Sequence, residues 1–130
     1  MEIECQNNII VLHEFIESWL KGTVDKSKQI FQYFEDALDS NFVIVNPGGD
    51  LQLKEQVTKN LWSAYGTQSE SFNINIKNIT IRFMSDSVCL LNYEEHQTGT
   101  EVTTRISSVL FKKSKNTNNY HWLHLHETWR

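Results

Sequence analysis

Residues 105–113 (RISSVLFKK) and 120–129 (YHWLHLHETW) decide the fold of this chain. Residues 120–129 largely alternate apolar and polar side chains, and 105–113 hold a short apolar run between polar ends; both patterns are typical of β-strands. The residues between them, 114–119, are polar and rich in Asn, so they predict a hairpin loop. The two segments therefore predict an antiparallel hairpin that completes a sheet.

The sequence upstream of this hairpin predicts two more strands. Residues 88–97 form the next predicted strand, which ends at a turn near Gly99. In the run 71–84, the apolar positions are even-numbered from 72 to 76 and odd-numbered from 79 to 83. A one-residue change of phase inside a long strand predicts a β-bulge, which bends a sheet.

The first half of the chain carries helical patterns instead. Apolar residues recur at helical spacing in 9–20, which Gly22 ends, and again in a segment that Ser27 can cap. A third helix is predicted for 54–65, after a short strand at 42–46 and a Pro/Gly turn. The order is helix, helix, strand, helix and then four strands joined by hairpins.

This order predicts a single α+β domain over residues 1–130. The N-terminal helices are expected to pack on a strongly curved antiparallel sheet, because the bulge bends it and the helices have apolar faces to bury. With 130 residues, of which 39% are hydrophobic, the chain is long enough for one real core and too short for two ordinary domains.

Charge and cysteine content exclude several classes of function. The net charge of −4 gives no electrostatic reason to expect nucleic acid or an anionic membrane as a partner. Cys5 and Cys89 do not make a disulfide framework, so we expect free thiols in a reducing compartment. Residues 1–8 do not read as a signal peptide, and no apolar run has the length of a membrane span. A cytoplasmic protein is the expectation.

The C-terminal segments resemble a known signature. A strand ending in Lys112 and Lys113 is followed by a strand that contains Trp122 and the pattern His124-x-His126. This combination resembles the SnoaL-like proteins and the association domain of calcium/calmodulin-dependent kinase II, in the nuclear transport factor 2-like superfamily with its cone-shaped, cystatin-like fold. Residues 42–49 (FVIVNPGG) are similar to the short strand and turn of those families. The resemblance implies a pocketed fold that hosts many functions.

The chain also departs from these relatives. The kinase association domain lines its pocket with arginines, whereas Glu127 and Ser108 stand at two of the corresponding positions here. The sequence therefore predicts a neutral to acidic pocket that disfavours an anionic ligand. Ketosteroid-isomerase-like members need an acidic base and an oxyanion partner; Glu127 or Glu94 could be the base, and no partner motif is present.

Strand register predicts which side chains share a face. With the turn centred on Thr100, Glu95 lies across from Arg105 and Tyr93 from Ser107. We place the more apolar face under the helices, with polar groups towards its open end, which is the pattern of a ligand pocket. The catalytic positions predicted on it are Glu127 and Glu94. The predicted pocket residues are Trp19, Phe34, Trp62, Asn92, Ser108, Leu125 and Trp129.

The opposite face is predicted to meet a second copy of the chain. A sheet face rich in aromatic and imidazole groups is unlike one that faces water, and burial in a homodimer is the simplest solution. The predicted interface residues are Tyr93, Phe111, Trp122, His124 and His126. His124 and His126 could form a metal pair with Glu95, but interface histidines are the preferred interpretation. Neither a metal nor a cofactor is expected.

Three hypotheses for function follow from this sequence. The first is a homodimeric SnoaL-like module that binds a small, mostly apolar, neutral or cationic molecule between the helices and the sheet. The second is an enzyme of the ketosteroid-isomerase or polyketide-cyclase type, in which a pocket carboxylate transfers a proton in an isomerisation, dehydration or cyclisation. The third is a pure oligomerisation module.

Overall fold

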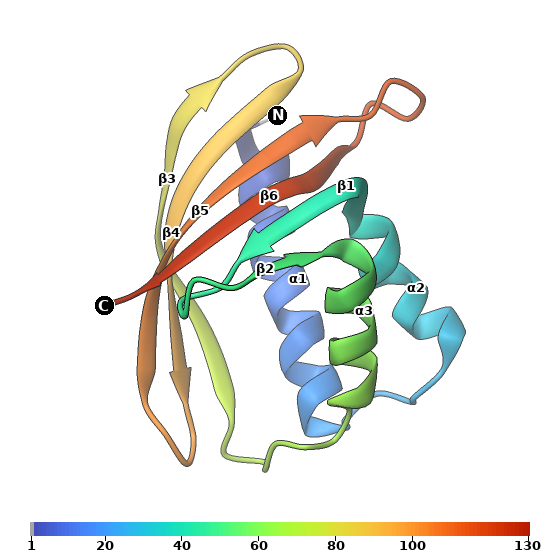
Figure 1. Cartoon of the computed structure of the whole chain (residues 1–130), viewed down its shortest axis with the longest axis vertical. Helices are drawn as coiled ribbons and strands as arrows, with labels where there is room; N and C mark the ends of the chain where they lie inside the picture. Colours follow the sequence, from blue (N-terminus) through green and yellow to red (C-terminus); the bar gives the residue numbers. More distant parts are fainter. Residues whose placement is uncertain (1) are drawn as a thin grey trace.

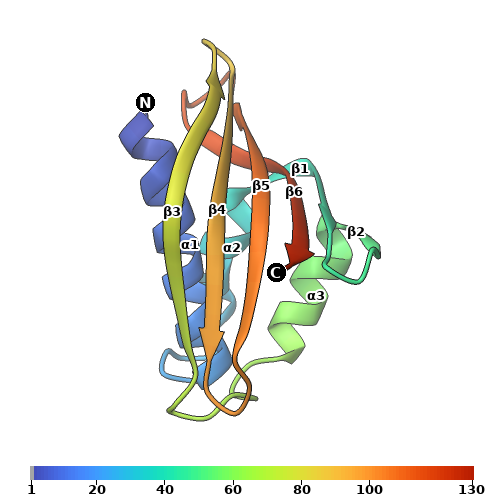
Figure 2. The same cartoon turned by 90° about the vertical axis from the view of Figure 1, so that its left-hand side faces the viewer.

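The structure is a computed structural model, and it describes residues 2–130. Three helices lie against one face of a six-stranded sheet (Figure 1), and the turned view looks onto the other face of the sheet, with α1 and α2 behind it (Figure 2). The predicted α+β fold of helices on a curved sheet is confirmed. The elements are α1 (Glu2–Lys21), α2 (Lys28–Ala37), β1 (Leu38–Val45), β2 (Leu51–Leu53), α3 (Lys54–Ser63), β3 (Asn73–Met84), β4 (Val88–Thr98), β5 (Thr103–Lys113) and β6 (Tyr120–Trp129).

The sheet is mixed, whereas the sequence predicted antiparallel pairing. Its order is β2-β1-β6-β5-β4-β3, and β1 runs parallel to β6 while the other neighbours are antiparallel. A parallel pair needs a long crossover connection. Here β1 follows α2, and β2, α3 and three further strands lie between β1 and β6 along the chain. No hairpin therefore forces β1 to run antiparallel to β6.

The predicted bulge in the long strand β3 is confirmed. Its register against β4 shifts between Lys77 and Thr80, and Asn78 has φ of 55° in the left-handed region. Asn is among the few non-glycine residues that tolerate this conformation. The bulge lets Ile76 and Ile81, which stand at positions of opposite parity, both pack against the core.

The helices begin and end near the predicted residues apart from the start of α1; α3 ends at Ser63, two residues before its predicted end. Ser27 caps α2, its side chain accepting a hydrogen bond from the Ile30 backbone N–H at 3.1 Å. The helix α1 starts at Glu2 rather than at residue 9, which adds Cys5 to the buried set. Among the described residues, no helix is long and apolar enough to cross a membrane.

The buried face of the sheet is the reverse of the predicted one in β4 and β5. In β4 the buried residues are Leu91, Tyr93 and Glu95, and their partners on β5 include Ser107 and Val109. The predicted β4–β5 register was right, so the error lies between β5 and β6: Ser107 and Val109 share a face with Glu127 and Leu125, whereas the prediction placed them on opposite faces. In β6, Leu125 and Glu127 do lie under the helices, as predicted.

Candidate functional site

A small cavity of about 190 Å³ lies between the helices and the sheet. Most of its wall is apolar, but five polar side chains converge on it from α1, β4, β5 and β6. These polar residues are His13, Glu95, Gln97, Arg105 and Glu127. The apolar wall is made by Leu12, Ile16, Phe34, Leu38, Phe42, Ile44, Val57, Trp122 and Leu125. A mostly apolar cavity with a few convergent polar groups has the composition of a ligand site.

His13 and Glu95 form the deepest polar pair. The imidazole Nδ1 lies 2.7 Å from the Ile9 carbonyl oxygen, and Nε2 lies 3.1 Å from Glu95 Oε1. Both partners are acceptors, so both ring nitrogens donate and the imidazole is protonated. The second Glu95 oxygen accepts from the Gln97 amide at 2.6 Å. Glu95 is thus held as an anion between a cation and an amide.

The electrostatics of this pair agree with its geometry. Burial disfavours charge on His13, but the hydrogen bond to Glu95 and its negative charge outweigh burial and raise the pKa of His13 above 6.5. Burial would likewise raise the pKa of Glu95, but the hydrogen bond and charge of His13, together with Arg105, lower it to about 2. Glu95 is therefore a fixed charge and a poor proton acceptor.

Arg105 and Glu127 form a second pair on β5 and β6. Arg105 Nη1 donates to Glu127 Oε1 at 3.1 Å, and the guanidinium lies under the Trp129 ring, 5.0 Å from its centroid. Burial of Glu127 and the nearby charge of Glu95 raise the pKa of Glu127, despite the opposing charge of Arg105. The buried Nε of Arg105 has no hydrogen-bond partner among residues 2–130.

Arg105 and Gln97 also line an outer cleft of about 380 Å³, whose wall includes Phe72 and Trp129. The two spaces share these two side chains, so Arg105 and Gln97 stand between the inner cavity and the surface. The side chain of Arg105, with its unpartnered Nε–H, thus lines both spaces, whereas Glu127 lines the inner cavity. The arrangement can hold a small molecule by hydrogen bonds at one end and apolar contacts at the other.

Several predicted pocket residues lie at or near this site. Phe34, Leu125 and Glu127 line the inner cavity, and Trp129 lines the outer cleft. Their roles as ligand contacts or catalyst stay predictions. Trp19 is fully buried and donates from Nε1 to the Leu61 carbonyl at 2.8 Å, so it is a core residue.

The remaining predicted pocket residues lie elsewhere. Trp62 lines a separate groove between α2 and α3. Asn92 and Ser108 lie on the outer face of the sheet, where the Asn92 amide donates to Ser108 Oγ at 2.7 Å. Glu94 is also on the outer face, where it accepts from Asn78, His96 and Arg130. The cavity positions predicted for Asn92, Ser108 and Glu94 are wrong, because β4 and β5 present the other face to the helices.

The predicted interface residues divide in the same way. Tyr93, Phe111 and Trp122 are in the core and at most 1% exposed, so their interface assignment is wrong. His124 and His126 lie on the outer face, with ring centroids 6.5 Å apart. In the part of the chain that the structure describes, no three His, Cys, Asp or Glu side chains are grouped to hold a metal ion.

Sequence reasoning missed His13 and Gln97, and placed Arg105 on the face away from the pocket. For His13 a signal was present: it stands four residues after Ile9 and three before Ile16, at the helical phase of the buried face. A histidine at a core phase of an amphipathic helix needs a buried partner. For Arg105 and Gln97 no comparable signal exists, because both faces of their strands carry polar residues.

Comparison with known proteins supplies the family. Residues 6–130 match the protein family described as sucrose-6-phosphate phosphohydrolase C-terminal. The chain belongs to this family. No curated protein matches the chain significantly.

Solved structures give the fold. An NTF-2 like protein of unknown function from Pseudomonas aeruginosa has a TM-score of 0.89 and 22% identity, covering 98% of both chains. A candidate ketosteroid isomerase from Shewanella frigidimarina has a TM-score of 0.71 and 13% identity, covering 94% of this chain and 92% of its own. The association domain of C. elegans CaMKII has a TM-score of 0.70 and 10% identity, covering 98% and 96%. The fold is therefore nuclear transport factor 2-like, as the sequence resemblance implied.

Proposed function

We propose that this domain binds a small molecule in the inner cavity, with His13, Glu95, Arg105 and Glu127 as its polar contacts. The observation that carries the proposal is the convergence of four ionisable side chains, from four elements, on an otherwise apolar cavity. Burying charged pairs is a weak means of stabilising a fold, since desolvation offsets most of their attraction. Such groups concentrate at functional sites instead.

The dimensions and charge of the cavity define the ligand. Its volume of about 190 Å³ lies below the range of about 300–1,000 Å³ that suits drug-sized molecules. Two cationic and two acidic side chains balance each other, which favours an uncharged ligand. We therefore expect a compact molecule with an apolar body and one hydroxyl or carbonyl group, which would bond to Arg105 Nε or to Glu127.

The test uses cyclohexanol and cyclohexanone as probes in a titration followed by backbone amide chemical shifts. Sucrose 6-phosphate belongs in the same panel as an anionic comparison, because the family name refers to a phosphohydrolase of that compound. Shifts should centre on the cavity lining. Arg105→Met should weaken binding roughly tenfold, as expected for the loss of a charge-assisted hydrogen bond.

Arg130→Met is the matched control, because Arg130 pairs with Glu94 on the outer face. It should leave the affinity unchanged. Shifts that avoid the cavity lining, or equal affinities for the Arg105 and Arg130 variants, would contradict binding at this site.

A second function is supported by Glu127. Its pKa is raised by burial and by Glu95, which moves it towards the range in which a carboxylate exchanges protons at neutral pH. In this hypothesis Glu127 removes a proton from the carbon beside a ketone and returns it to the γ-carbon. With 3-cyclohexenone as substrate, Glu127→Gln should abolish isomerisation to the conjugated enone while binding is retained. Unchanged turnover in that variant would exclude Glu127 as the base.

We also propose a homodimer, formed through a surface different from the predicted residues. Register partners across all six strands form a row on the outer face, and five of its six members are apolar. The row consists of Phe83, Leu90, Leu110, His124, Val43 and Leu53. Phe83 and Leu53 are 56% and 54% exposed. A continuous apolar row on an uncovered face favours a second copy of the sheet as its partner.

Sedimentation velocity tests the dimer. Leu110→Glu, near the middle of the row, should shift the protein from dimer to monomer because it places a charge in an apolar contact. Val102→Glu is the control, since Val102 is 78% exposed and stands outside the row. A wild-type protein that sediments as a monomer would refute the dimer and would also remove the pure oligomerisation hypothesis.

A further inference from the structure

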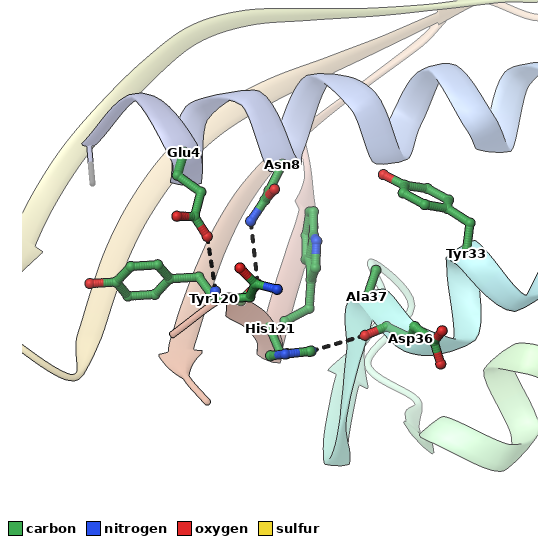
Figure 3. A pocket seen from close by; sticks show the side chains of 9 residues that line it. Glu4, Asn8, Tyr33, Asp36, Ala37, Tyr120 and His121 are labelled. Atoms are coloured by element: carbon green, nitrogen blue, oxygen red, sulfur yellow. Dashed lines mark hydrogen bonds between the residues drawn. The ribbon is translucent and has the colours of Figure 1, made fainter. Parts of the chain in front are cut away.

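A second hollow, separate from the inner cavity, lies at the other end of the helical layer. Its volume is about 440 Å³, and it is bounded by the first half of α1, the end of α2 and the start of β6. Figure 3 shows the side chains of Glu4 and Asn8 reaching from α1 towards β6, with Tyr33 and Asp36 supplied by α2. Trp122 is the wall that this hollow shares with the inner cavity.

Three hydrogen bonds between distant segments fix this hollow. Glu4 Oε2 accepts from the Tyr120 N–H at 3.0 Å, and Asn8 Nδ2 donates to the Tyr120 carbonyl at 3.3 Å. His121 Nδ1 donates to the Asp36 carbonyl at 2.9 Å (Figure 3). These contacts join both helices to the start of β6, so the polar wall is held in place before any ligand arrives.

Several polar groups that line this hollow make no hydrogen bond to the described residues. No described residue bonds to the Tyr33 hydroxyl, to the side-chain amide of Asn119 or to Glu4 Oε1. Trp122 lines the hollow, and its indole N–H has no acceptor among the described residues without being one of their fully buried unpartnered atoms, so this donor stays accessible. The free set therefore contains donors, an acceptor and groups that serve as both.

This mixture of groups defines a ligand class. Two carboxylates, Glu4 and Asp36, repel phosphates and other anions. A simple cation would use the carboxylates but would leave the amide, phenol and indole donors without a role. Hydroxyl groups both donate and accept, so a molecule rich in hydroxyls matches every free group. We propose that this hollow is a binding site for a neutral saccharide of one or two rings, distinct from the inner cavity.

The volume supports this size. It falls within the range of about 300–1,000 Å³ that is typical of ligand pockets, whereas the inner cavity is much smaller. The Tyr33 ring, which is 42% exposed, offers apolar surface to the C–H face of a sugar ring. The carboxylates and the amides of Asn8 and Asn119 line the same hollow and offer partners for its hydroxyls.

The experiment is a titration of the full chain with sucrose, followed by isothermal calorimetry and by backbone amide shifts. Tyr33→Phe and Asn119→Ala each remove a side-chain group that makes no hydrogen bond to the described residues 2–130, so neither should unfold the protein. Each should weaken sucrose binding by about threefold to tenfold, the usual effect of one lost hydrogen bond. Asn116→Ala, in the same loop and outside the hollow, should bind as the wild type does.

The remaining outcomes are decisive against the proposal. No saturable shift at about 10 mM sucrose, which is ten times a millimolar dissociation constant, would overturn it. So would binding of 1,4-diaminobutane without binding of sucrose, since that would make the hollow a cation site. Sucrose binding that Glu127→Gln weakens and Tyr33→Phe does not would place the sugar in the inner cavity instead. The cyclohexanol affinity of Tyr33→Phe should equal that of the wild type, so the two sites fail or succeed independently.

Discussion

Glu94 and Glu95 are neighbours in β4, and each meets a histidine at hydrogen-bond distance, but on opposite faces of the sheet. Outside, Glu94 accepts from His96 at 3.0 Å, and the side chains of the two are 19% and 25% exposed. Inside, Glu95 accepts from His13 at 3.1 Å, and the side chains are 5% and 6% exposed. The carboxylate–imidazole distance is thus nearly the same in the two pairs while burial differs, and the electrostatic interaction is stronger where water is excluded.

Removing the histidine from each pair is the strongest way to test this comparison. His13→Leu would leave Glu95 buried without its cation, and we expect a loss of about 3–5 kcal/mol in the free energy of unfolding. His96→Leu should change stability much less, because Glu94 is partly exposed to water and keeps hydrogen bonds from Asn78 and Arg130. Urea denaturation of both variants measures the difference. Equal losses would show that the inner pair is not desolvated.

A second comparison uses the adjacent leucines of β4. Leu91 is fully buried, whereas Leu90 belongs to the row on the outer face. Leu91→Ala should lower the free energy of unfolding by about 2–5 kcal/mol through lost transfer energy and a cavity. Leu90→Ala should cost much less when the protein is monomeric, as in the Leu110→Glu background. The reverse order would restore the face assignment that the sequence suggested.

The free energy of unfolding should depend on pH through the ionisation of His13 and Glu95. The folded pKa of His13 exceeds 6.5, so its contribution is complete below pH 6.5 and is lost as the pH rises through the folded value. The pKa of Glu95 falls from 4.5 to about 2, so its contribution is present above pH 4.5 and is lost as the pH falls towards 2. Glu127, with a raised pKa, stabilises the fold on the acidic side of 4.5 and partly offsets that loss.

Stability should therefore be greatest between about pH 4.5 and pH 6.5, the interval between the two ordinary pKa values. Thermal melts across pH 2–9 would measure it. His13→Gln should remove the decline on the alkaline side, and His96→Gln should retain it. A wild-type melting temperature that stays constant from pH 6 to pH 9 would contradict the raised pKa of His13.

The smallest effect is expected at the outer ion pair. Arg130 donates to Glu94 at 2.8 Å, and its side chain is 58% exposed. Arg130→Ala should alter stability by an amount near the detection limit, and 1 M salt should abolish the effect by screening. The measurement is the urea midpoint at low and high salt. A large change that persists in high salt would mean that this face is covered, which would support the dimer.

The strand β6 shows why parity failed to assign the faces. Its register against β5 shifts between Leu110 and Phe111, whose partners are His124 and Trp122, so Leu123 has no partner. This extra residue is a bulge, and it allows Trp122 and Leu125 to share the buried face. Counting alternate residues from either end of the strand therefore gives conflicting answers. The apolar positions of 120–129 do change phase, from Tyr120 and Trp122 to Leu123, Leu125 and Trp129, but the prediction assumed a single phase for this strand.

The candidate site was predictable only in part. Glu127, Leu125 and Phe34 were placed at the cavity because the last strand and the second helix have clear patterns. His13 pairs with Glu95 across 82 positions of sequence, and no local rule relates them. The balance of positive and negative side chains in the cavity also depends on Arg105. Arg105 faces inward because the helices cover that side of β5.

By itself, the sequence determined the element types, the order of the last four strands, the β4–β5 register and the bulge in β3. These depend on side-chain period, turn residues and local capping, all of which act over a few positions. Only the tertiary structure decided the parallel pairing of β1, the covered face of β4 and β5, and the meeting of His13 with Glu95. These depend on which of two amphipathic surfaces buries more area against the helices, a difference that belongs to the packed chain as a whole.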